Sequence, residues 1–183
     1  SIIGRNLPYT LGLSLTSTLL GWVIGNFIGL LAGFRKNARS SKIMESIAIC
    51  IYPIPYFLIA LILQIFFAYV LGWFPISTTL LTRGTFWQWL GSLLHASILP
   101  ALSLLLVGTG WQIISMKSLA LTTSEEDFVS FARYRGVSEG RIGMSYVFRN
   151  CILTQITALA MSLGGVFGGS IMTEIIFGYP GVG

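Results

Sequence analysis

The chain has 183 residues, of which 54% are hydrophobic and only 9% are charged. Soluble domains carry about 25% charged residues, and a soluble core of this size does not require so much apolar surface. The composition therefore argues against an ordinary soluble domain and indicates helices that lie in lipid. The net charge of +5 comes from basic residues in the connections between apolar runs, which is typical of a membrane protein rather than a nucleic-acid-binding one.

The two ends of the chain indicate that it is a piece of a longer membrane protein. It starts at Ser1 and stops at Gly183 inside a turn rich in glycine and proline. We therefore expect residues 1–183 to form a single transmembrane domain whose outermost spans are missing.

Four apolar segments are long enough to be membrane spans, which need about 20 residues each. The first, residues 7–34, contains no charged residue, and four of its glycines are spaced by four. This spacing predicts a helix face that a neighbouring helix can approach closely. These glycines are Gly21, Gly25, Gly29 and Gly33.

The other three segments differ in how glycine and proline are placed. Residues 43–73 exceed one straight crossing, and Pro53 and Pro55 predict a kink or break inside them. The third span is expected at residues 93–116. The fourth, at residues 151–177, holds glycines that favour tight helix contact or a flexible point.

The connections between the spans differ sharply in charge. Nine basic residues lie in the first and third connections, and one, Arg83, lies in the second. Cytoplasmic connections carry the excess of lysine and arginine. We therefore predict that residues 34–42 and 117–150 are cytoplasmic and that residues 74–92 lie outside. The nine are Arg35, Lys36, Arg39, Lys42, Lys117, Arg133, Arg135, Arg141 and Arg149.

The third connection, residues 117–150, has the pattern of two short helices. Thr123 followed by Glu126 predicts a capping box, and the acidic run that ends at Asp127 favours a helix N-terminus. An apolar face is predicted from the i, i+3, i+4 spacing of its members. These members are Phe128, Phe131 and Ala132.

The first of these short helices also has a predicted end. Arg133 and Arg135 come where cations are favoured, and Gly136 supplies a left-handed cap. Ser138 is positioned to cap the next helix. An amphipathic helix is thus presented to the cytoplasm. A helix lying on lipid headgroups is the alternative, but the polar face is acidic as well as basic, which favours docking to a soluble partner.

The run DFVSFARYRGVSEGRI, followed by FRN, resembles the cytoplasmic loop motif of binding-protein-dependent ABC transporter permeases. It is most similar to the dipeptide, oligopeptide and nickel branch. FRN and the ending TEIIFGYPGVG look like the first, B-type, permease subunit of that branch, whereas Thr154 stands where a proline is common. The matching motif positions are Asp127, Phe128, Ala132, Arg133, Arg135, Gly136, Ser138, Glu139 and Arg141.

The resemblance implies an all-α polytopic bundle with the ABC importer permease fold, placed in the cell inner membrane. It implies a transmembrane subunit that forms the pathway for peptides or similar small solutes. The matched residues, together with Phe131, would form the coupling helix that contacts the ATPase.

The implied partners are a second permease subunit, two ABC ATPases, an external solute-binding protein and lipid, without nucleic acid. The chain itself has no P-loop pattern. We therefore expect that the chain is not an enzyme and binds no cofactor or metal. ATP and Mg²⁺ would be used by the partner ATPases.

Polar residues in or near the spans are candidates for the pathway or a gate, because such groups are costly in lipid. They are Glu174, Asn26 and Gln64. Interhelical or interfacial hydrogen bonding is the alternative role for each. For the whole chain, the alternatives are a secondary transporter and a membrane scaffold without transport. A secondary transporter would usually need acidic groups near the midplane or broken helices in inverted repeats, and midplane acids are not expected here.

Overall fold

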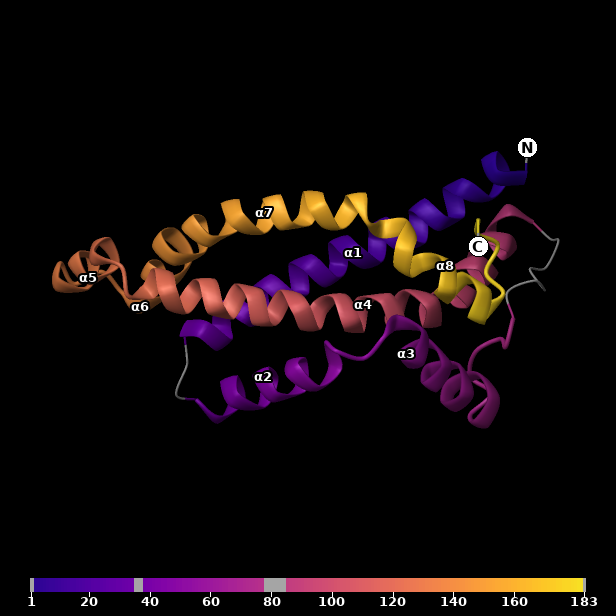
Figure 1. Cartoon of the computed structure of the whole chain (residues 1–183), viewed down its shortest axis with the longest axis horizontal. Helices are drawn as coiled ribbons and strands as arrows, with labels where there is room; N and C mark the ends of the chain where they lie inside the picture. Colours follow the sequence, from indigo (N-terminus) through magenta and orange to yellow (C-terminus); the bar gives the residue numbers. More distant parts are fainter. Residues whose placement is uncertain (1, 35–37, 78–84, 183) are drawn as a thin grey trace. The chain divides into compact units, whose positions relative to one another are not determined.

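The computed structural model describes residues 2–34, 38–77 and 85–182, and every regular element in these ranges is a helix (Figure 1). Two π-helices, η1 (Gln64–Val70) and η3 (Ile142–Phe148), continue α3 and α6 directly. The all-α prediction is therefore confirmed. The α-helices are α1 (Ile2–Phe34), α2 (Arg39–Ile51), α3 (Tyr56–Leu63), α4 (Phe86–Ser124), α5 (Asp127–Tyr134), α6 (Glu139–Arg141), α7 (Arg149–Gly164) and α8 (Val166–Phe177).

Among the described residues, two helices are long and apolar enough to cross a membrane: Gly4–Phe34 and Phe86–Ser124. A third crossing is reached when Arg39–Ile51 and Tyr56–Val70 are counted together. The fourth expected span is divided at Gly165 into α7 and α8, which have 16 and 12 residues. Each piece is shorter than the roughly 20 residues of a straight crossing, so this segment reaches that length only as two joined pieces.

The predicted break in the second span is confirmed. The helix α2 ends at Ile51 and α3 begins at Tyr56, with Pro53 and Pro55 between them. Proline lacks the N–H that an interior helical residue donates, and its ring clashes with the preceding turn. Pro55 instead precedes the first turn of α3, where its carbonyl accepts hydrogen bonds from the N–H groups of Leu58 and Ile59 at 3.0 and 3.4 Å.

The chain divides into two compact units, and the first comprises Ser1–Leu20, Ile54–Val107 and Leu163–Gly183. In this unit α3 packs against α8. Its core is a cluster of buried apolar side chains from α3, η1, α4 and α8. They are Ala60, Leu63, Ala68, Leu99 and Phe177.

The second unit comprises Gly21–Pro53 and Gly108–Ser162, and its centre is the predicted glycine face. A Cβ on Gly29 would lie 2.7 Å from the Ile113 carbonyl oxygen and 2.8 Å from the Met116 Cβ. A Cβ on Gly33 would lie 2.8 Å from the Ala120 Cβ. The backbones of α1 and α4 therefore approach as closely as the glycines permit, which confirms the packing role expected of these residues.

Contacts in the second unit also define the directions of its helices. Along α1, Gly25 lies against Gln112 and Gly33 against Ala120, so this part of α1 runs parallel to α4. The helix α2 runs antiparallel to α4. Glu45 pairs with Lys117, whereas Tyr52, the C-cap of α2, lies against the earlier Trp111 with ring centroids 5.1 Å apart.

These directions agree with the crossing order predicted from charge. The parallel packing places Phe34 and the C-terminal part of α4 at the same end of the second unit, where the two basic connections begin. The basic residues Arg35 and Lys36 of the first connection lie outside the described residues, as does Arg83 of the second.

Cysteine labelling tests this orientation. In a chain whose Cys50 and Cys151 are replaced by alanine, a membrane-impermeant maleimide added outside is expected to modify Trp87→Cys and to spare Ser138→Cys. Both positions are exposed, so accessibility within the chain does not limit labelling. The same reagent should modify Ser138→Cys after permeabilisation, and labelling of Ser138→Cys in sealed cells would contradict the orientation.

Candidate functional site

The proposed coupling segment begins later than the sequence indicated. We predicted a connection from Lys117 onward, but α4 continues as helix to Ser124. Two hydroxyl groups bond back to the helix, from Thr122 Oγ1 to the Ser118 carbonyl at 3.2 Å and from Ser124 Oγ to the Ala120 carbonyl at 2.6 Å. The charge of Lys117, which suggested a loop, is accommodated inside the bundle by an ion pair with Glu45.

The predicted capping box at the start of α5 is wrong. Thr123 still belongs to α4, and its Oγ1 lies 3.4 Å from the Cys151 Sγ rather than at a helix N-terminus. The N-cap of α5 is Glu126, which makes no side-chain capping bond, and Asp127 supplies the acidic group of the first turn. The expected position of the acidic residues is therefore confirmed, whereas the hydrogen bonds of the box are not formed.

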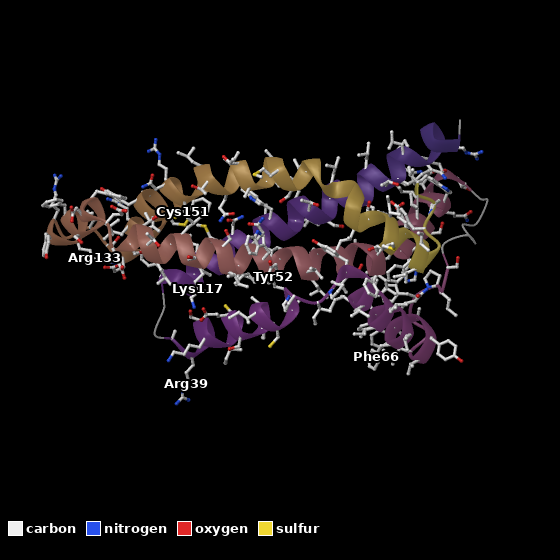
Figure 2. All side chains as sticks on the ribbon, viewed as in Figure 1. Arg39, Tyr52, Phe66, Lys117, Arg133 and Cys151 are labelled. Carbon is white, nitrogen blue, oxygen red and sulfur yellow. The ribbon has the colours of Figure 1, made fainter. Side chains whose placement is uncertain are left out.

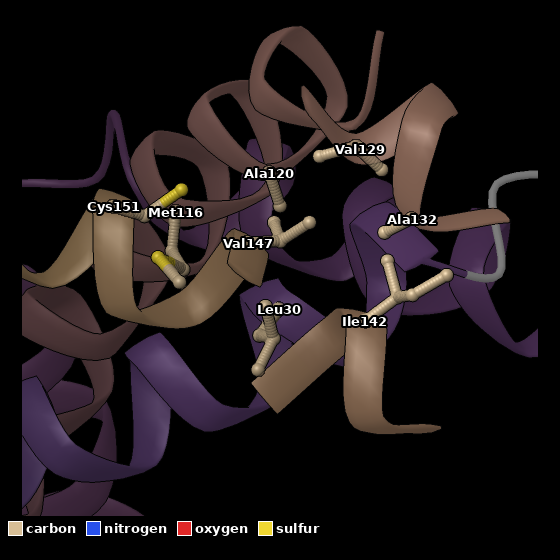
Figure 3. Close-up of a cluster of buried hydrophobic side chains, with 8 residues drawn as sticks. All are labelled: Leu30, Met116, Ala120, Val129, Ala132, Ile142, Val147 and Cys151. Atoms are coloured by element: carbon tan, nitrogen blue, oxygen red, sulfur yellow. The ribbon is translucent and has the colours of Figure 1, made fainter. Parts of the chain in front are cut away.

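The apolar side chains of α5 are divided between a buried face, whose Val129 and Ala132 point into the core cluster (Figure 3), and an exposed face. Val129 and Ala132 are buried in the core cluster of the second unit. Phe131 and Tyr134 are 66% and 86% exposed, and Phe128 is 39% exposed. The single apolar face predicted from Phe128, Phe131 and Ala132 is thus wrong, because Ala132 belongs to the base of the helix and the two phenylalanines belong to its outer side.

The base of α5 is well anchored. Val129 and Ala132 share their cluster with residues from α1, α4, η3 and α7, and most of these are nearly inaccessible to solvent. Apolar burial of this kind contributes about 25 cal/mol per Å² to stability. It holds the exposed aromatic row of Phe128, Phe131 and Tyr134 in a fixed direction. The other members of the cluster are Leu30, Met116, Ala120, Ile142, Val147 and Cys151.

Gly136 ends α5 in the way predicted. Its φ is +76°, in the left-handed region where a side chain is strained. The Gly136 N–H donates to the Arg133 carbonyl at 2.9 Å, and the Val137 N–H donates to the Ala132 carbonyl at 3.1 Å. This is the Schellman arrangement, and Val137 packs against the cluster that contains Ala132, as the motif's apolar contact requires.

An exposed ion pair joins the two sides of this turn. The Arg133 Nε donates to the Glu139 Oε1 at 3.0 Å, and both side chains are open to solvent. Ser138 occupies the N-cap of α6 as expected, but it makes no side-chain capping bond. The remaining motif residues, Arg135 and Arg141, are exposed. The motif thus presents aromatic, basic and acidic groups together on one exposed segment.

The three candidate pathway residues are engaged inside the protein. Asn26 is 3% exposed and donates from Nδ2 to the Trp22 carbonyl at 2.7 Å. The Gln64 Nε2 donates to the carbonyls of Ile76 and Ile176 at 2.9 and 3.0 Å. The Gln64 bond to Ile176 joins η1 to α8 and is thus of the interhelical kind named as the alternative to a pathway role, whereas the Asn26 bond stays within α1.

Glu174 is 1% exposed and lies beside the C-terminal turn of the first unit. Its carboxylate packs directly on Gly181, at a place that any added Cβ would occupy. Its backbone carbonyl accepts from the Tyr179 N–H at 2.9 Å. Gly178, with φ of +55°, forms the left-handed cap of α8, so this acidic side chain is enclosed where the helix reverses into the turn.

Two features of the second unit were not expected from the sequence. Tyr134 extends the exposed aromatic row of α5, and its i+3 spacing from Phe131 was an available signal. The pairing of Glu45 with Lys117 had no local signal, because 72 positions separate the partners along the chain. Only the packing of α2 on α4 brings them together.

Residues 25–183 match the family described as binding-protein-dependent transport system inner membrane component. The chain is similar to a di/tripeptide transport system permease protein of Pseudomonas aeruginosa, with 29% identity over 96% of this chain and 57% of the relative. It is 28% identical to an oligopeptide transport system permease protein of Haemophilus influenzae, over 100% of this chain and 56% of the relative.

A glutathione transport system permease protein of Salmonella choleraesuis is 30% identical over 100% of this chain and 55% of the relative. The chain thus spans a little over half the length of these relatives. The family match covers Gly25, Gly29 and Gly33 of the glycine face, the α5 motif and the C-terminal turn in one continuous stretch. The chain therefore belongs to the family of binding-protein-dependent transport system inner membrane components.

Proposed function

We propose that this protein is the transmembrane subunit of an ATP-driven importer and forms part of the pathway for peptides or similar small solutes. The family supports this assignment, and so do the names of three relatives, which are called permeases of di/tripeptide, oligopeptide and glutathione transport systems. We place the subunit in the cell inner membrane, with α5 facing the cytoplasm.

The observation that carries the proposal is the two-sided construction of α5. An aromatic row that includes Phe131 and Tyr134 is exposed on a short helix whose other side is fixed in the core. Exposed aromatic side chains on a rigid support are suited to fill a pocket on a partner. We therefore assign α5 as the coupling helix that an ABC ATPase grips.

The chain would act without a nucleotide site of its own. ATP and Mg²⁺ would be bound by two ATPase subunits, and closure of the ATPase pair would move α5. Because Val129 and Ala132 fix α5 to α4, η3 and α7, that movement would be passed to the membrane helices as a rigid-body shift. A second, related permease and an external solute-binding protein would complete the assembly.

Reconstitution tests this function. The full-length permease, co-expressed with its neighbouring permease and ATPase genes, should co-purify with the ATPase. In lipid vesicles, ATP hydrolysis should rise when a peptide-loaded binding protein is added. Solute transport by the purified permease alone, without ATP, would contradict the proposal and favour a secondary transporter. A lack of both transport and ATPase association would favour a scaffold.

The exposed and buried sides of α5 should respond differently to truncation. Phe131→Ala is expected to weaken ATPase binding about tenfold, equivalent to about 1.4 kcal/mol, without lowering thermal stability, because Phe131 is mostly exposed. Val129→Ala removes apolar groups from a side chain that is 0% exposed, and it should lower stability by roughly 1–2 kcal/mol.

Binding is measured by titrating labelled ATPase into permease nanodiscs, and stability by thermal unfolding of the same samples. Val129→Ala is the control for general damage to α5. If Phe131→Ala bound the ATPase as tightly as the unmodified protein, the outer face of α5 would not be the docking surface.

A further inference from the structure

Glu45 and Lys117 form an ion pair where charged residues are scarce. Glu45 is the only acidic residue among the first 124 of the sequence. The Lys117 Nζ donates to the Glu45 Oε2, and the two side chains are 9% and 40% exposed (Figure 2). A buried ammonium group requires a compensating partner. Lys117 can therefore lie inside the bundle because Glu45 pairs with it.

Lys117 occupies a junction in the second unit. Its neighbours Met116 and Ala120 belong to the same core cluster as Val129 of α5. Its carbonyl oxygen lies against Gly33 of α1, 3.1 Å from where a Cβ would stand. A displacement at the base of α5 therefore reaches α4 at the turn that carries Lys117.

The ion pair differs in kind from the other contacts between α2 and α4. At the end of α2, the ring of its C-cap Tyr52 lies against the ring of Trp111, and the Ala48 carbonyl lies against Gly110. Contacts of this type are weakly directional and permit one helix to slide along another. A charged hydrogen bond fixes one position along the helix, and polar pairs that set helix register are known in other bundles.

We propose that Glu45 and Lys117 are positioning residues that fix the register of α2 on α4, so that movement at α5 is transmitted to α2. The inference about register stands on the geometry alone. The inference about transmission rests on the proposed function.

Spin-label distances test the register. Ile47 on α2 and Ser118 on α4 are both exposed and can carry labels in the full transporter after Cys50 and Cys151 are replaced. The unmodified pair should give one narrow distance distribution, and Glu45→Gln should broaden it to at least about twice the width. Glu45→Gln keeps a hydrogen-bond acceptor beside Lys117, so the variant is expected to fold. An unchanged distribution would overturn the proposal.

ATP hydrolysis tests the transmission. Glu45→Gln and Lys117→Gln should keep the ATPase bound and keep basal hydrolysis, but lose about fivefold in stimulation by the loaded binding protein. The double variant Glu45→Lys with Lys117→Glu should regain most of the stimulation and the narrow distance distribution. Lys42→Gln, on the same helix, is the control and should retain full stimulation.

Full stimulation in both single variants would overturn the transmission. If the reversed pair folded normally but gave as little stimulation and as broad a distance distribution as the single variants, the ion pair would not be what fixes the register. If the unmodified transporter showed no stimulation at all, the proposed function would fail and the transmission with it, whereas the spin-label result would still decide the register.

Discussion

Replacing Gly136 with aspartate is expected to abolish stimulated ATP hydrolysis while the protein remains inserted in the membrane. The φ of Gly136 is +76°, a conformation that costs a residue with a Cβ roughly 1–2 kcal/mol. Aspartate tolerates this region better than most residues, but its negative charge would stand at the C-terminal end of α5, where the helix dipole disfavours it. The turn would open, and the aromatic row would lose its fixed direction.

Two further variants separate these causes. Valine tolerates positive φ poorly and carries no charge, so Gly136→Val should also lose the stimulation of ATP hydrolysis. Gly140→Ala, four positions on, is the control, because a Cβ there meets no atom within 4 Å and the backbone has no positive φ. The measurements are ATPase co-purification and hydrolysis in vesicles. If Gly136→Asp kept full association with the ATPase and full stimulation of hydrolysis, α5 would not be the coupling helix.

Gly29→Ala is expected to destabilise the protein by forcing α1 and α4 apart. The new Cβ would lie 2.7 Å from the Ile113 carbonyl oxygen and 2.8 Å from the Met116 Cβ. Because one of these atoms belongs to the backbone, α1 and α4 would have to separate. Overpacking of this kind costs about 1–3 kcal/mol, and it would disturb the cluster that supports α5, since Met116 is a member.

Gly12→Ala is the matched control in the same helix. A Cβ on Gly12 meets no atom within 4 Å, and alanine is favoured over glycine in a helix by up to about 1 kcal/mol. Thermal unfolding of the two variants in the same detergent should therefore move in opposite directions. An unfolding temperature for Gly29→Ala equal to that of the unmodified protein would show that the helices do not pack at this face.

Local patterns predicted the parts of this fold that depend on few neighbouring residues. The break between α2 and α3 follows from Pro53 and Pro55, because a missing N–H acts wherever the chain lies. The end of α5 follows from Gly136, because positive φ is a property of one residue. The glycine spacing in α1 likewise predicted a close helix contact, although it did not identify α4 as the partner.

Predictions that depended on the surroundings of a side chain were less successful. Thr123 has the spacing of a capping residue, yet α4 continues past it, and its hydroxyl lies beside Cys151 of α7. Phe131 and Ala132 are adjacent in the predicted apolar face, yet only Ala132 contacts the core. A spacing rule shows which residues share a helix face but not which part of that face a neighbouring helix covers.

The sequence by itself determined the membrane setting, the helical class, the position of the proline break and the motif that marks the family. Each of these depends on composition or on residues close together in the chain. Only the tertiary structure decided which side of α5 is buried, that α1 packs parallel to α4, and that Lys117 lies inside the bundle as the partner of Glu45. The physical reason is that these outcomes depend on contacts between segments distant in sequence. Those segments set both the cost of burying a charge and the gain from burying an apolar side chain.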